Sequence, residues 1–156
     1  MGEQKAPQEI QGGSHPSQRL YPAMIIFTTV FQAGEGPAKA ENGVIRTNAD
    51  LRKFLRNLAN LTNPADVTAS LESKVDFEKE QLIFVALGER PSGHEAQINT
   101  VTYLTNRGKE LPSLTEVSHR EIAIHGTMAD ADEQPTYPMH VIKLRRLLGE
   151  TTFNKN

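Results

Sequence analysis

The stretch Val75-Asp-Phe-Glu-Lys-Glu-Gln-Leu-Ile-Phe-Val-Ala-Leu-Gly-Glu-Arg-Pro-Ser-Gly-His-Glu-Ala-Gln-Ile98 decides the fold class, because it holds the most apolar run of the chain. Six consecutive apolar residues, Leu82 to Leu87, stand between a charged segment and a loop with two glycines and a proline. Such a run is typical of a strand buried on both faces. Residues Glu95 to Leu104 indicate a second strand, so the sequence predicts that the intervening loop is the tip of a hairpin.

A helix is predicted upstream of this strand. Thr47-Asn-Ala-Asp50 has the side chains of a capping box, and apolar residues then recur at helical spacing as far as Leu61. Asn63-Pro64 ends this helix, and the proline together with Asp66 is a suitable start for a shorter helix through Leu71.

Four further segments have strand character. Val44 to Arg46 is short, Met24 to Phe31 is rich in β-branched and aromatic residues, and Leu114 to His125 alternates loosely. Tyr137 to Leu144 is predicted to be the last strand. In the strand after the loop the apolar residues change face, which predicts a bulge near Asn99-Thr100.

Together these elements predict an α+β domain, a mainly antiparallel sheet of about five or six strands with one amphipathic helix packed on it. A β-sandwich or a partly open barrel with a helix is the alternative. The predicted domain spans residues 21–148. Residues 1–20 contain too little apolar surface to offset the entropy of ordering and are predicted to be a disordered tail. Residues 149–156 are predicted to fray.

Composition excludes several functional classes. The 156 residues are 37% hydrophobic and 23% charged, with a net charge of −2, so no overall field attracts nucleic acid. The chain has no cysteine, which excludes disulfides, thiolate metal sites and thiol nucleophiles. No apolar run approaches the roughly 18 residues of a membrane span. The first residues lack a signal peptide, so the sequence is consistent with the cytoplasm or with export followed by removal of a leader.

Histidines are the first candidates for a metal site, and four fall within the predicted domain: His94, His119, His125 and His140. His119 and His125 would lie about 20 Å apart on a regular strand, and no His-x-His or His-Glu-x-x-His spacing occurs. The sequence therefore predicts no metal and no cofactor, and the preferred interpretation is scattered structural histidines. A histidine-based, metal-dependent enzyme is the alternative function.

Other candidates for chemistry are weaker. The acidic loop Asp130 to Glu133 lacks the pattern of a calcium-binding loop. Ser92 is not in a Gly-x-Ser-x-Gly elbow and is interpreted as a turn serine. The basic run Lys143 to Arg146 is too short to indicate nucleic-acid binding. No catalytic residue is predicted, and the protein is not expected to be an enzyme.

Three motifs occur in an order that carries a family resemblance. They are Val75-Asp76-Phe77, then the apolar strand with Leu87-Gly-Glu-Arg-Pro-Ser-Gly93, and finally Tyr137-Pro-Met-His-Val-Ile-Lys143. This set resembles the C-terminal domain of the protease complex subunit PrcB family and covers about the second half of the chain. The family loop continues with Gly-Gly-Tyr, whereas His94-Glu95 follow here, which puts in doubt any partner contact through that aromatic residue.

The resemblance implies a non-catalytic protein that associates with, or stabilises, a partner such as a protease. A buried strand that feeds a Pro-Gly loop is also a usual way to present a stiff recognition surface. The predicted function is therefore a protein-binding module, with the acidic loop Asp130 to Glu133 as a second contact. A structural alternative treats the Pro-Ser-Gly segment only as a turn that sets strand register. The predicted partner-binding residues are Glu89, Arg90, Pro91, Ser92, Gly93, His94 and Glu95.

Overall fold

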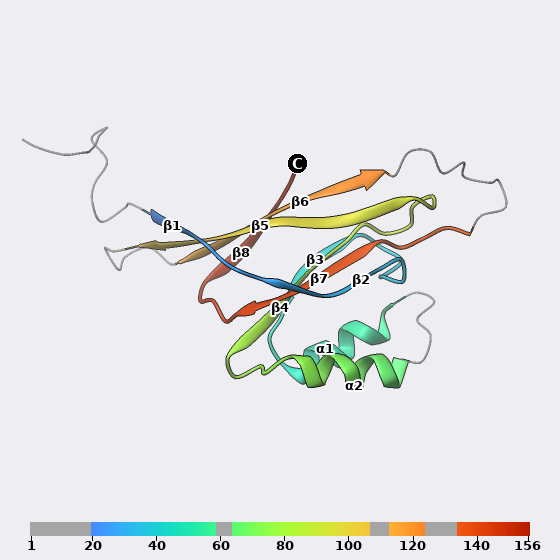
Figure 1. Ribbon diagram of the computed structural model, residues 1–156, viewed down its shortest axis with the longest axis horizontal. Coiled ribbons are helices and arrows are strands. Elements are labelled where there is room, and N and C mark those ends of the chain that lie inside the picture. Colours follow the sequence, from blue (N-terminus) through green and yellow to red (C-terminus); the bar gives the residue numbers. More distant parts are fainter. Residues whose placement is uncertain (1–19, 59–63, 107–112, 124–133) are drawn as a thin grey trace, which may run out of the picture.

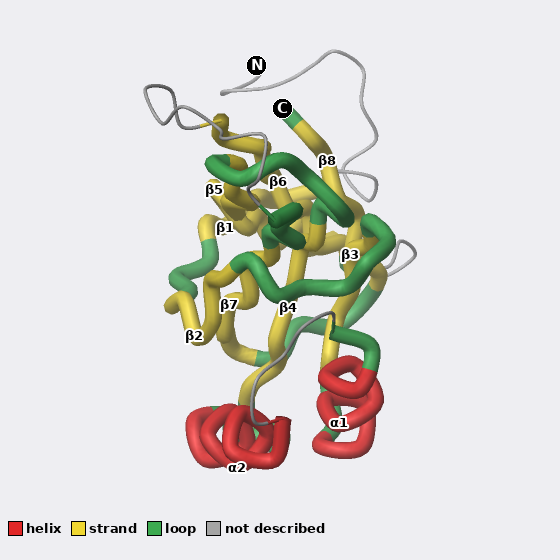
Figure 2. The backbone as a smooth tube through the Cα atoms, turned by 90° about the vertical axis from the view of Figure 1, so that its right-hand side faces the viewer, coloured by secondary structure: helices red, strands yellow, loops and turns green. Residues whose placement is uncertain are grey.

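Two four-stranded sheets lie face to face, and two helices cover the outer face of one of them (Figures 1 and 2). The computed structural model describes residues 20–58, 64–106, 113–123 and 134–156. The predicted α+β class is confirmed. Within the described ranges there are eight strands and two helices, where the sequence predicted five or six strands and one helix. Residues 1–19, which make up nearly all of the predicted tail, lie outside the described residues.

The first sheet has the order β1-β5-β6-β8. Its strands are β1 (Leu20–Met24), β5 (His94–Asn106), β6 (Leu114–Ala123) and β8 (Glu150–Lys155). The β1–β5 and β5–β6 pairs are antiparallel, whereas β8 runs parallel to β6.

The second sheet is antiparallel throughout and has the order β2-β7-β4-β3. Its strands are β2 (Thr28–Ala33), β7 (Met139–Arg145), β4 (Glu80–Ala86) and β3 (Glu41–Ile45). Because β4 lies between two strands and between the other sheet and the helices, each residue from Leu82 to Leu87 is at most 4% exposed. The prediction of a strand buried on both faces is confirmed.

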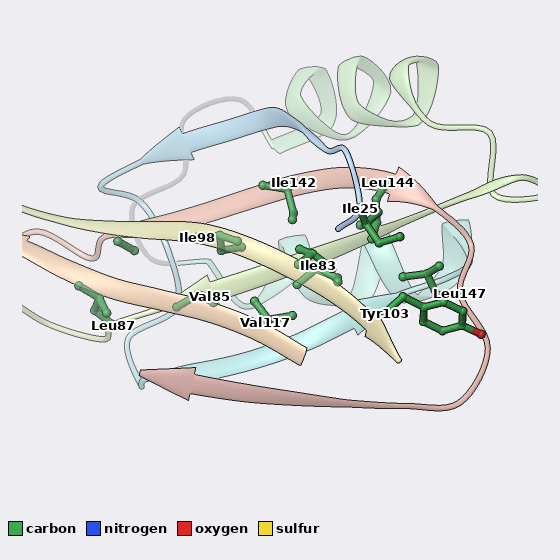
Figure 3. Packing of buried hydrophobic residues seen from close by; sticks show 12 residues of the cluster. Ile25, Ile83, Val85, Leu87, Ile98, Tyr103, Val117, Ile142, Leu144 and Leu147 are labelled. Carbon is green, nitrogen blue, oxygen red and sulfur yellow. The ribbon is translucent and has the colours of Figure 1, made fainter. Parts of the chain in front are cut away.

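The alternation along β4 divides its side chains between two cores. Ile83, Val85 and Leu87 face the first sheet and pack in the inter-sheet core (Figure 3). Leu82 and Phe84 face the helices, where Phe84 stacks at a tilt on Phe54 with a centroid distance of 4.3 Å. Strand β4 therefore contributes side chains to both cores, as β7 also does.

The two helices pack side by side on the second sheet (Figure 2). Helix α1 (Asn48–Arg56) begins as predicted, with Thr47 Oγ1 accepting the amide hydrogen of Asp50 at 3.0 Å. It ends earlier than predicted, and Leu61 lies outside the described residues. Helix α2 (Pro64–Lys74) opens at the predicted proline.

The prediction of a hairpin tip is wrong. Strands β4 and β5 belong to different sheets, so the loop between them crosses from one sheet to the other. The physical reason is that β3 and β7 already occupy both hydrogen-bonding edges of β4. The predicted bulge is confirmed, because the β5–β6 register shifts between Ile98 and Thr100.

Two other segments differ from their predictions because of the sheet that each one joins. The stretch Met24 to Phe31 is not one strand, because the chain leaves the first sheet after β1, buries Ile25 and enters the second sheet as β2. The chain also does not fray after Leu148. It turns at Gly149, which has a φ of +88°, and adds β8 to the edge of β6.

In the part of the chain that the structure describes, no helix is long and apolar enough to cross a membrane.

Candidate functional site

The crossover loop between β4 and β5 is fastened to a distant segment of the chain. Gly88 leaves the buried strand with a φ of +80°, a conformation that favours glycine. Arg90 and Thr136 then exchange backbone hydrogen bonds, both of 2.8 Å. The loop that the sequence presented as a free tip is therefore held at its middle by the segment that precedes β7.

Glu121, on β6, receives two side chains of this loop region. Arg90 Nε donates to Glu121 Oε2 at 2.9 Å, and His94 Nδ1 contacts the same oxygen at 2.6 Å. Lys155 of β8 lies 3.4 Å from the other oxygen. We call these four residues the Glu121 cluster. Because an ionised carboxylate only accepts hydrogen bonds, His94 must carry its hydrogen on Nδ1.

The Glu121 carboxylate is strongly held in its charged form. Its partial burial alone would raise its pKa, but hydrogen bonds from Arg90 and His94, the Arg90 charge and a hydrogen bond from Lys155 lower the pKa to about 2. The carboxylate is therefore ionised throughout the physiological range, and both ends of the loop stay bound to it.

Three side chains of the loop face solvent. Glu89, Pro91 and Glu95 are exposed, whereas Arg90, Ser92 and His94 are half-buried. No ion pair joins the Glu89 or Glu95 carboxylate to any residue within the described ranges. The loop thus pairs its cation with Glu121, while its two acids stay exposed and form no ion pair within the described residues.

Two hollows flank the loop. The proline hollow, of about 280 Å³, lies at Glu89, Arg90, Pro91 and Pro135. The seam hollow, of about 170 Å³, lies where β5 faces the end of β2. The seam hollow is lined by Gln32, Ala33, Gly34, His94, Glu95, Ala96, Thr136 and Met139.

Side chains of the second sheet complete the wall of this seam. Strand β1 pairs with β5 only from Thr102 onward, so within the described residues the earlier part of that edge has no paired strand. Gln32 Nε2 donates to the carbonyl oxygen of Ala96 at 2.9 Å. The amide of Ile98, beside the bulge, donates to His140 Nδ1 at 2.9 Å. The carbonyl of Ala96 and the amide of Ile98 therefore have side-chain partners in place of a paired strand.

His140 and His119 are buried apart from the loop. His140 Nε2 is 2.7 Å from Thr29 Oγ1, and burial lowers its pKa. Burial, and secondarily the charge of Lys155, also lowers the pKa of His119, whose ring meets Phe153 edge-on. The structure thus brings only His94 of the predicted histidines into the Glu121 cluster. His125 lies outside the described residues.

In residues 20–58, 64–106, 113–123 and 134–156, no three His, Cys, Asp or Glu side chains gather as potential metal ligands. The acidic loop Asp130 to Glu133 falls outside these ranges. A wider hollow of about 430 Å³ lies between the helices, but Arg52 and Glu72 on its wall already pair with each other at 2.7 Å. We therefore take the loop and the Glu121 cluster as the candidate site.

Sequence reasoning missed Glu121 and Thr136. The alternation of β6 contained a signal for Glu121. Val117, His119 and Glu121 are every second residue of the strand, and this set faces inward. Thr136 carries no comparable signal, since its contact with Arg90 is a backbone pairing across the fold.

The chain was also compared with known proteins. No family model, no curated protein and no solved structure matches it.

Proposed function

We propose that the protein is a non-catalytic protein-binding module whose recognition surface is the loop from Glu89 to Glu95. The observation that carries the proposal is the convergence of Arg90 and His94 on one oxygen of Glu121, together with the backbone pairing of Arg90 and Thr136. These contacts hold the loop in one shape from two sides while Glu89, Pro91 and Glu95 remain exposed.

Such preorganisation favours binding. A flexible loop loses conformational entropy when a partner orders it, at a cost of about 0.5–1.5 kcal/mol for each immobilised side chain. A loop that is already held does not lose that entropy again. The resemblance to the PrcB family makes a protease the first partner to test, and regulation or stabilisation of that partner the first role.

The test compares a loop variant with a matched control. Glu89→Ala/Pro91→Ala/Glu95→Ala removes exposed side chains that form no ion pair within the described residues, and Glu150→Ala/Thr152→Ala removes exposed side chains on β8. Cross-linking and affinity capture with each protein identifies partners, whose dissociation constants are then measured with purified components. We expect the loop variant to bind at least about tenfold more weakly, a change of about 1.4 kcal/mol, and the control to bind like the wild type.

A partner that binds all three proteins within about twofold would remove the loop from consideration. Loss of binding by both variants would point to a global effect, and urea denaturation of each variant separates that case from a local one.

The histidine-based, metal-dependent enzyme keeps one supporting observation. Glu121 orients His94 through Nδ1, an arrangement in which a carboxylate prepares the other ring nitrogen to bind a proton or a metal. Metal analysis of the untagged protein tests this alternative. A stoichiometric transition metal that is lost in His94→Ala would favour it over the binding module.

A further inference from the structure

We propose that the partner of this loop is a protein segment that carries two basic side chains, one for each hollow beside the loop. This inference rests on the proposed function and specifies the chemistry of the partner. Its basis is the charge that remains at the surface after the Glu121 cluster has formed.

The loop carries two acids, Glu89 and Glu95, and one base, Arg90. The fold pairs that base within the protein. Arg90 Nε lies 2.9 Å from Glu121 Oε2, so the Glu121 carboxylate balances the charge of Arg90, and His94 Nδ1 lies 2.6 Å from the same oxygen. The two glutamates remain exposed and have no ion pair within the described residues. The loop is therefore acidic toward a partner.

Each hollow contains one of these two acids. Glu89 lies at the proline hollow, where Arg90 belongs to the Glu121 cluster and the two prolines supply apolar surface. Glu95 lies at the seam hollow, and none of the described residues that line it is a lysine or an arginine. Their volumes, about 280 and 170 Å³, are several times the roughly 30 Å³ of a water molecule and can admit the end of a long side chain.

A lysine or arginine side chain fits a hollow that combines apolar surface with a carboxylate. Its alkyl stem can lie on apolar surface such as Pro91 and Pro135 while its charged end reaches a carboxylate. A second cation would meet Glu95 at the seam hollow. An acidic partner would meet the two exposed carboxylates and be repelled, and nucleic acid is disfavoured for the same reason.

The test uses a tri-lysine peptide as the probe, with tri-glutamate for comparison. Tri-lysine should shift the NMR amide signals of Glu89, Arg90 and Glu95 in a saturable way, with a dissociation constant on the order of 1 mM. Glu89→Gln/Glu95→Gln should weaken this binding at least fivefold, whereas Glu150→Gln on β8 should not change it. Tri-glutamate should cause no saturable shift.

Equal shifts with both peptides, or unchanged tri-lysine binding in the double variant, would overturn the inference. The two proposals can fail separately. If tri-lysine does not bind but the loop variant still loses its captured partner, the proposal of a basic partner segment is wrong and the proposal of a binding module stands. If tri-lysine binds while every captured partner binds the loop variant as tightly as the wild type, the acidic surface exists but is not the recognition surface.

Discussion

Glu121 is the residue on which the conformation of the crossover loop depends. In the folded protein its pKa is about 2, against an ordinary value of 4.5, so its carboxylate stabilises the fold fully above pH 4.5. That contribution is lost as the pH falls toward 2. One pKa unit corresponds to about 1.4 kcal/mol, and because solvent screens the cluster in part we expect a contribution of about 1–3 kcal/mol.

Glu121→Gln should therefore lower the free energy of unfolding at about pH 7 by this amount, and by much less at about pH 3. Urea denaturation of the wild type and the variant at both pH values measures the difference. The same gap at both pH values would mean that the carboxylate charge does not hold the loop.

His140 has a structural role that two substitutions can separate. Burial lowers its pKa below the ordinary 6.5, so the unfolded chain takes up a proton below that pH while the folded protein does not. Stability contributed by neutral His140 is thus present above pH 6.5 and is lost as the pH falls below it. His140→Asn removes this titration and keeps an acceptor near the amide of Ile98.

We expect the wild type to lose more stability than His140→Asn between about pH 7.5 and about pH 5.5. His140→Leu should lose about 1–3 kcal/mol at the higher pH, because the amide of Ile98 is left without an acceptor. Thermal or urea unfolding of all three proteins provides the measurement. Equal stability of the leucine and asparagine variants would contradict the proposed role.

Among the elements, β8 depends most on a single turn. Gly149 has a φ of +88°, and a Cβ atom there would collide with the carbonyl oxygen of Ser113. Gly149→Ala should detach β8 from β6 and lower stability by about 2 kcal/mol or more, since strain and collision add. Hydrogen exchange of the β8 amides reports the detachment.

Leu148→Ala is the matched control for this turn, because Leu148 is 79% exposed and precedes the glycine. It should leave exchange in β8 unchanged and stability within about 0.5 kcal/mol of the wild type. Protected β8 amides in Gly149→Ala would show that the turn can relax.

The elements also differ in how far the sequence predicted them. The start of α1, the burial of β4 and the bulge in β5 each follow from local patterns: a capping threonine, an unbroken apolar run and a change of apolar face. Strand β8 has no such pattern. Its residues alternate only weakly between exposed and half-buried positions, and its strand conformation comes from pairing with β6.

For the whole molecule, β4 couples the two cores. Leu82 faces the helices and Ile83 faces the other sheet, although the two residues are neighbours in one strand. Leu82→Ala should cost about 2–5 kcal/mol through lost burial and the cavity that remains. Because both cores share this strand, we expect the NMR signals of α1 and of Val117 to disappear at the same urea concentration. Earlier loss of the α1 signals would show that the helices unfold separately.

The sequence by itself determined the fold class, the central buried strand and the position of the candidate loop. These depend on local periodicity, capping and turn chemistry, which a single chain segment carries. Only the tertiary structure decided that the loop crosses between sheets, that β8 completes the first sheet, and that Glu121 neutralises Arg90 and contacts His94. These features depend on which strand edges are already occupied and on side chains about 30 residues apart in sequence, whose meeting results from packing. The acidic character of the loop toward a partner belongs to this second group.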